Sequence, residues 1–262
     1  MTLYEIAAIL GALAWCYPIG VLIHKLMVKP KVSYIPADRA EIGYTSFGPI
    51  FNLDCAIATK RKDAILEKFR IDITHEKGEK HSFKWNLLNE TQTEILPFSG
   101  SGGGLLQKSQ QAIAIKISTS LLLERKILFR DVEFLKQYAR KLQKYEELKM
   151  RLKKTDSSNQ EQEIIRSKEY VDLIGLFERS LYWREGKYDM IISSIDHATG
   201  KAFKESYSFK LDTNDEDRLK ENIEKIKKYF NSTVSNSSNE QDNEETDLVW
   251  NWIYPEITKD GQ

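Results

Sequence analysis

The sequence predicts a mainly β protein with helical additions, in which an N-terminal transmembrane helix precedes an antiparallel, immunoglobulin-like β-sandwich. Three patterns support this fold class. Residues 6–23 form one apolar run, apolar side chains recur at every second position between residues 51 and 118 and again between 188 and 211, and helical spacing takes over between residues 131 and 182. A period of two is typical of half-buried strands, and a period near 3.6 of amphipathic helices. About seven strands of this kind suit two packed sheets.

The apolar run Ile6–Ile23 predicts a membrane anchor over residues 1–28. A helix needs about 20 mostly apolar residues to cross a hydrocarbon core of roughly 30 Å. The side chains that follow the run are basic: His24, Lys25, Lys29 and Lys31. Positive charge beside a span stays on the cytoplasmic side, so we expect a single-pass membrane protein whose soluble domain faces the cytoplasm. A cleaved signal peptide is the weaker alternative, because nothing basic precedes Ile6.

Small residues and a proline lie on one face of this predicted helix: Ala7, Gly11, Ala14 and Pro18. Small side chains let two helices approach closely in lipid, which makes self-association one interpretation. The other interpretation is that small residues are simply common in membrane helices and that Pro18 only kinks this one. The sequence leaves both open.

Composition and charge narrow the function classes. The 262-residue chain has a formal net charge of zero and a pI of about 6.9. It therefore lacks an overall basic field for collecting phosphates, and we expect no nucleic acid partner. Cys16 lies in the predicted anchor and Cys55 in a predicted strand, so the two are poorly placed to pair, which fits a reducing compartment. No motif predicts a cofactor.

After a short linker over residues 29–40, the sandwich is expected over residues 41–230. Its first strands carry alternating apolar or aromatic residues: Phe51, Leu53, Cys55 and Ile57; Phe69, Ile71 and Ile73; His81, Phe83 and Trp85; Ile113, Ile115 and Ile117. The glycine-rich segment Gly100–Gly104 precedes the last of these strands. It lacks the Lys and Ser or Thr that follow a phosphate-binding loop, so we interpret it as a hairpin loop.

Residues 131–182 predict a helical hairpin inserted among the strands, with a polar break at residues 155–159. Two strands follow, over residues 188–195 and 203–211, with a turn that contains Gly200 between them. They form the clearest β-hairpin in the chain. Thr213 and Glu216 match a capping box for a C-terminal helix over residues 214–229.

Residues 231–247 are mostly Ser, Asn, Glu and Asp and predict a disordered linker. The tail beyond it, residues 248–262, carries the aromatic side chains Trp250, Trp252 and Tyr254. A solvated tail has no physical reason to keep such a cluster. The tail either docks on its own domain as an added strand or binds a partner as a linear motif, and these three residues are the predicted partner-binding site.

Two groups of polar residues at predicted turns have chemical potential. Four titratable side chains surround the turn at Gly78: His75, Glu76, Glu79 and His81. They resemble a zinc ligand set, but a slip of one residue in strand register would separate them. Three more flank the later hairpin without a nucleophile in a catalytic motif: Asp189, Asp196 and His197. We therefore predict no metal, no catalytic residue and no enzymatic activity.

The anchor, the helical hairpin and the tethered tail together predict a non-enzymatic interaction or sensing protein, which binds a protein partner at the membrane. The lipid bilayer is the second expected partner. The alternative is a membrane-perturbing effector, of the toxin or defence type, that oligomerises through its transmembrane helix when the soluble domain is triggered.

Overall fold

The computed structural model describes residues 14–24, 27–93, 105–111, 113–153, 160–235 and 249–259. In this part of the chain, twelve strands form a single antiparallel sheet. The strands are β1 (Lys31–Pro36), β2 (Glu41–Thr45), β3 (Gly48–Lys60), β4 (Ala64–His75), β5 (Lys80–Thr93), β6 (Leu105–Gln111), β7 (Ala114–Ile117), β8 (Leu123–Asp131), β9 (Gly186–Asp196), β10 (Ala202–Leu211), β11 (Trp252–Ile253) and β12 (Ile257–Lys259).

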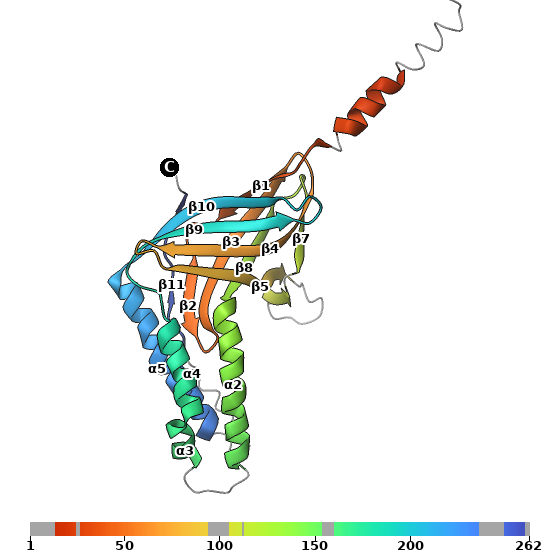
Figure 1. Ribbon diagram of the computed structural model, residues 1–262. Coiled ribbons are helices and arrows are strands. Elements are labelled where there is room, and N and C mark those ends of the chain that lie inside the picture. Colours follow the sequence, from red (N-terminus) through yellow and green to blue (C-terminus); the bar gives the residue numbers. More distant parts are fainter. Residues whose placement is uncertain are drawn as a thin grey trace, which may run out of the picture.

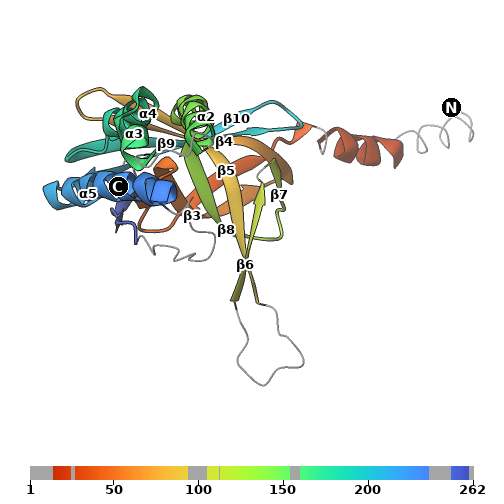
Figure 2. The same cartoon turned by 90° about the horizontal axis from the view of Figure 1, so that it is seen from below.

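The sheet is curled, and its strands follow the order β11-β2-β3-β8-β5-β4-β9-β10-β12 (Figure 1). Three strands lie off this path: β1 pairs with β3, β6 with β5, and β7 with β4. The paired strands β5 and β6 extend beyond the rest of the sheet as a projecting hairpin (Figure 2).

The C-terminal segment joins the two edges of this curled sheet. Strand β11 pairs with residues 42–43 of β2, and β12 pairs with residues 207–209 of β10. At the start of β12, Ile257 N donates a hydrogen bond to Asp38 O (2.8 Å) in the segment between β1 and β2. One short segment therefore forms backbone hydrogen bonds with strands at both edges of the sheet, β2 and β10.

The alternation of side chains along the strands gives the sheet two faces. Phe83, Ile71 and Ile192 pair across β5, β4 and β9 and are at most 2% exposed. We call the face that carries them the inner face, and the next residue on each strand points to the opposite, outer face. The core lies on the inner face. Trp183 belongs to it, with ring centroids 6.5 Å from Phe51 and 5.7 Å from Phe83.

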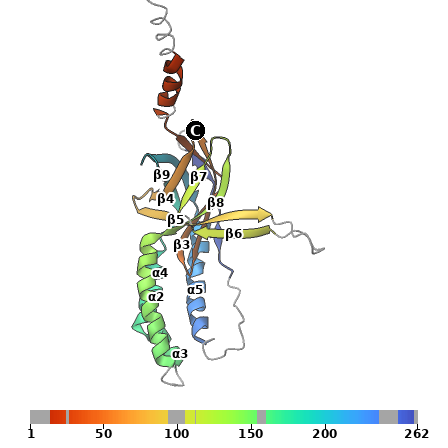
Figure 3. The ribbon, with the colours of Figure 1, turned by 90° about the vertical axis from the view of Figure 1, so that its right-hand side faces the viewer.

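The helices are α2 (Val132–Lys153), α3 (Gln160–Arg166), α4 (Lys168–Ser180) and α5 (Thr213–Ser235). Together they project from one end of the sheet, and we call them the helical arm (Figures 1 and 3). The ring of Phe177 on α4 packs 5.3 Å from that of Phe134 on α2 and 5.8 Å from that of Phe230 on α5. The hydroxyl of Tyr44 on β2 donates to Phe177 O (2.6 Å) and so ties the arm to the sheet.

The predicted immunoglobulin-like sandwich is wrong. The strands form one sheet whose pairing runs without a break from β11 to β12, so there is no second sheet packed face to face in the described residues. The period-two pattern shows only that one side of each strand is buried. A curled sheet with helices at its end buries that side as well as a sandwich does, and the pattern does not distinguish the two.

The predicted single-pass anchor over residues 1–28 is contradicted as well. Among the residues that the structure describes, no helix has both the length and the apolar character needed to cross a membrane. The described N-terminal helix covers residues 14–24, which is 11 residues and about 16 Å at 1.5 Å per residue. Ala7 and Gly11, two of the predicted packing residues, lie outside the described residues.

The mainly β content and the inserted helices are confirmed. The helical hairpin predicted over residues 131–182 corresponds to α2, α3 and α4, and the C-terminal helix to α5. The N-terminal cap of α5 differs from the prediction, because the side chain of Asp212 rather than that of Thr213 accepts the hydrogen bond from Asp215 N (2.8 Å). The glycine-rich loop and most of the predicted linker, residues 236–247, lie outside the described part.

Candidate functional site

A pocket of about 600 Å³ lies where two neighbouring strands separate. Strand β4 pairs with β5 only from Arg70 onward, and its earlier residues 64–67 pair with β7 instead. Both strands are irregular at this point, with a register shift between Glu67 and Arg70 on β4 and another between Trp85 and Leu87 on β5. The pocket, which we call the basic pocket, is lined by Lys68, Phe69, Arg70, Lys84, Trp85, Ser193, Ser194, Ile195, Ala202 and Lys204.

Several of these cations belong to one line of residues across the sheet. Arg130 pairs with Lys84, Lys84 with Arg70, Arg70 with Ser193, and Ser193 with Lys204. Directly paired residues of an antiparallel sheet point to the same face, and the chain neighbours Phe83 and Ile71 are on the inner face. Arg130, Lys84, Arg70 and Lys204 therefore line up on the outer face, and we call them the cationic row.

The charges of this row are incompletely neutralised. Arg70 Nε lies 2.9 Å from a carboxylate oxygen of Asp72. Within the described part of the chain, Lys84 and Lys204 form no ion pair. The Nη1 atom of Arg130 is buried without a hydrogen-bond partner among these residues, and burial lowers the pKa of Arg130 to about 10. The row thus presents positive charge that a bound anion would stabilise.

Aromatic rings and hydroxyls complete the basic pocket. Phe69 is fully buried and Trp85 is half-buried, with their ring centroids 4.8 Å apart. Ser193 Oγ donates to Arg70 O (3.4 Å), and Ser194 Oγ lies 2.5 Å from the hydroxyl of Tyr34. The lining residues include no carboxylate, imidazole or thiol. The site therefore offers groups that bind an anion, together with a flat apolar surface.

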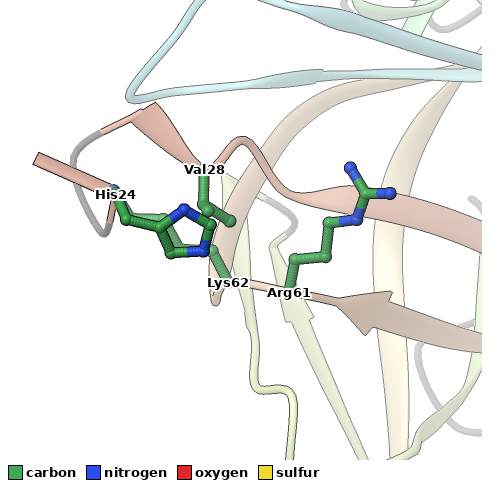
Figure 4. A pocket seen from close by; sticks show the side chains of 4 residues that line it. All are labelled: His24, Val28, Arg61 and Lys62. Carbon is green, nitrogen blue, oxygen red and sulfur yellow. The ribbon is translucent and has the colours of Figure 1, made fainter. Parts of the chain in front are cut away.

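A second pocket, of about 640 Å³, lies between the end of the N-terminal helix and the turn from β3 to β4 (Figure 4). His24 and Val28 come from the N-terminal side, and Arg61 and Lys62 from the turn. Residues 25–26 are adjacent to it in the chain and lie outside the described part. The basic pocket is the better candidate, because ordered strands supply its lining.

The predicted partner-binding residues lie against the protein's own sheet, or beside it. Trp252 is part of β11, and its ring covers Gly43 of β2 so closely that a Cβ at that position would collide with it. Trp250 is half-buried and packs against the core. Tyr254 is 54% exposed. The tail thus docks as an added strand, which was one of the two alternatives, and only Tyr254 presents most of its side chain to solvent.

The four side chains around the Gly78 turn each have other partners. His75 Nε2 lies 3.1 Å from Glu185 O, Glu76 Oε2 accepts a hydrogen bond from Lys187 N (3.1 Å), and Glu79 pairs with Arg184 (3.3 Å). His81 stacks on Tyr182. Among the described residues no group of His, Cys, Asp and Glu could hold a metal ion.

The residues around the later hairpin have partners in the structure, apart from the Oδ1 atom of Asp196, which is buried without a hydrogen-bond partner among the described residues. Asp196 is buried and accepts hydrogen bonds from Thr199 N (3.1 Å) and Thr199 Oγ1 (2.6 Å) in the β9–β10 turn. Asp189 pairs with Lys187 (3.5 Å), and His197 with Glu67 (3.2 Å).

Ala14 and Pro18, the described members of the predicted helix-packing face, are both exposed on the N-terminal helix. That helix points away from the sheet (Figure 1). The basic pocket was missed by the sequence reasoning, because its residues come from β4, β5, β9 and β10. The one local signal was the alternation of Arg70 and Lys84 with the apolar residues beside them.

No family model matches this chain, and no curated protein is significantly similar to it. A solved structure that resembles it is a family 123 glycoside hydrolase from Clostridium perfringens, studied for glycolipid glycan hydrolysis. The sequence identity is 12% and the TM-score 0.33, and the match covers 71% of this chain but 28% of the hydrolase. The chain spans less than a third of that protein, and so distant a similarity supports no conclusion about fold or function.

Proposed function

We propose that this chain is a non-enzymatic interaction protein that binds an acidic segment of a partner protein on the outer face of its sheet. The observation that carries the proposal is the cationic row, in which basic side chains from β8, β5, β4 and β10 share one line.

The dimensions of the row suit an extended peptide. Neighbouring strands are about 4.8 Å apart, so four steps across the sheet from Arg130 to Lys204 cover roughly 19 Å. About six residues of an extended peptide, at roughly 3.3 Å each, cover the same distance. Carboxylates on such a segment can reach several cations of the row at once.

Local charge rather than total charge would attract this partner. The formal net charge of the chain is zero, so there is no long-range field, and the attraction is confined to the outer face. Charge complementarity of this kind mainly raises the association rate and selects the partner. Binding should therefore weaken as added salt screens the exposed lysines.

Reversing two charges of the row tests the proposal. The probe is a fluorescent peptide of ten glutamates, and the measurement is fluorescence anisotropy at low salt. We expect Lys84→Glu combined with Lys204→Glu to weaken binding about tenfold or more, because two attractive contacts become repulsive. The matched control is Lys144→Glu with Lys228→Glu, which changes the net charge equally on exposed positions of the helical arm.

The control should bind the peptide as the unchanged protein does. Equal weakening in both double variants would mean that only net charge matters, and the assignment of the outer face would be wrong. Absence of peptide binding by the unchanged protein at low salt would contradict the proposed function itself.

A further inference from the structure

We propose that the basic pocket binds a nucleoside phosphate, with the base against Trp85 and the phosphate on Lys84, Arg70 and Lys204. This goes beyond the proposed function, since a small ligand could occupy the pocket whether or not a protein partner uses the cationic row. The inference rests on the way the pocket separates its apolar and its charged groups.

The two kinds of group lie side by side along the strands. Trp85 directly follows Lys84 on β5, and Phe69 directly precedes Arg70 on β4. Successive strand residues point to opposite faces, so the two rings lie toward the inner face and the cationic row on the outer face, and both line one pocket because β4 and β5 separate there. Ile195 and Ala202, which pair with each other across β9 and β10, extend the apolar part of the lining. A ligand that fits has a flat apolar part and an anionic part.

The shape of the site also suits a ligand of this size. Small-molecule sites commonly have volumes of about 300–1,000 Å³, and the basic pocket has about 600 Å³. The gap between β4 and β5 is built by the backbone, since the strands separate at the two register shifts. The backbone pairing thus contributes to this cavity, together with the side chains that line it.

The nearby carboxylates are already engaged. Asp72 forms an ion pair with Arg70 Nε (2.9 Å) and accepts a hydrogen bond from the hydroxyl of Ser82 (2.7 Å). Glu67 lies near Lys68 Nζ (3.7 Å) and His197 Nδ1 (3.2 Å). A phosphate at the row would therefore meet the two lysines without a competing carboxylate on either of them. Stacking of a base on an aromatic ring, here the half-buried Trp85, adds roughly tenfold in affinity.

Lys84, Arg70 and Lys204 belong to both the basic pocket and the cationic row. A nucleotide held there occupies the positive charge that an acidic peptide needs, so the two ligands should exclude one another. The pocket would then regulate partner binding, with nucleotide and peptide competing for the same side chains.

Isothermal titration calorimetry on the full chain tests the inference with three probes: AMP, adenosine and ribose 5-phosphate. We expect AMP to bind at least tenfold more tightly than either of the others, because only AMP reaches both halves of the pocket. Trp85→Ala should weaken AMP about tenfold and leave ribose 5-phosphate unchanged. Lys204→Met should weaken AMP and ribose 5-phosphate alike.

Matched controls separate the site from general effects. Trp15→Ala removes a tryptophan that is 69% exposed elsewhere, and Lys144→Met removes an exposed lysine of the helical arm; both should bind AMP normally. Trp85→Phe keeps a ring and should retain most of the AMP affinity, so the test stands even if Trp85→Ala does not fold.

Two results would overturn the inference and leave the proposed function standing. One is equal affinity for AMP and ribose 5-phosphate, with no effect of the Trp85 variants, which would make the site an anion patch only. The other is a lack of AMP binding by a protein that still binds the glutamate peptide.

Discussion

His81 lies flat against Tyr182, with ring centroids 3.3 Å apart and an angle of 8° between the ring planes. The hydroxyl of Tyr182 donates to Asp131 (3.1 Å), and Asp131 also caps α2 by accepting from Phe134 N (3.0 Å). Burial lowers the pKa of His81, even though the charges of Asp131 and Glu79 favour the protonated form. A histidine that looked like a metal ligand in the sequence thus joins strand β5 to the start of the helical arm.

This pKa shift predicts how stability depends on pH. Because the folded pKa of His81 is below its value in the unfolded chain, the unfolded state binds the proton more readily. The free energy of unfolding is then highest above about pH 6.5, the unfolded value, and falls as pH drops from there toward the lower folded pKa. Urea unfolding at pH 7.5 and 5.5 measures the effect.

The variant His81→Gln should show a smaller difference in stability between these two pH values. His24→Gln, at an exposed position of the N-terminal helix, is the control and should keep the original difference. If His81→Gln also keeps the original difference in the free energy of unfolding, a group other than His81 causes the pH dependence.

At the scale of elements, the short C-terminal segment with β11 and β12 is held in place by several buried contacts. Ile253 of β11 is fully buried in the core. Asn222 of α5, also fully buried, holds the backbone of Asn251 from both sides, donating to its carbonyl (2.8 Å) and accepting from its N–H (2.9 Å). Lys259 of β12 pairs with Glu205 (3.1 Å). The segment is therefore fastened to α5, β2 and β10.

Truncating one buried side chain of this segment should destabilise the whole protein. We expect Ile253→Ala to lower the free energy of unfolding by about 2–4 kcal/mol, because it leaves a cavity in the core. The control Val249→Ala lies at a position that is 77% exposed and should change stability by less than about 0.5 kcal/mol. Urea unfolding measures both. A negligible loss in Ile253→Ala would show that the segment is not docked in solution.

At the scale of the whole molecule, the sheet and the helical arm share one set of aromatic contacts. Phe177 of α4 lies 6.3 Å from Tyr44 of β2 and 5.8 Å from Phe230 of α5 (ring centroids). The hydrogen bond from Tyr44 to Phe177 O crosses the same boundary. We infer that the arm is an extension of the core rather than a separate folding unit.

This arrangement predicts a single cooperative unfolding transition. Far-UV circular dichroism, which reports the helices strongly, and near-UV circular dichroism, which reports aromatic packing, should give the same urea midpoint. Tyr44→Phe removes only the hydroxyl, leaves Phe177 O unpaired, and should cost about 1–2 kcal/mol. Loss of helical signal at a clearly lower urea concentration than the aromatic signal would contradict the single unit.

Local physics made several elements predictable from the sequence. Phe69, Ile71 and Ile73 alternate with polar residues because one side of β4 faces the core, and the helical spacing from Phe134 onward marks the buried side of α2. The apolar run at the N-terminus predicted a span from its length and composition. The helix that the structure describes there covers only residues 14–24, and no described helix is long and apolar enough to cross a bilayer.

The sequence by itself determined many of the strands and helices and which side of each is apolar, since these properties depend on residues a few positions apart. It did not predict β2 or β8, and β1 lies within the predicted linker over residues 29–40. Only the tertiary structure decided that the strands form one curled sheet, that the tail joins its two edges, and that Arg130, Lys84, Arg70 and Lys204 share one line. The physical reason is that strand pairing and register depend on contacts between distant segments. Periodicity shows that a face is buried, but not what buries it.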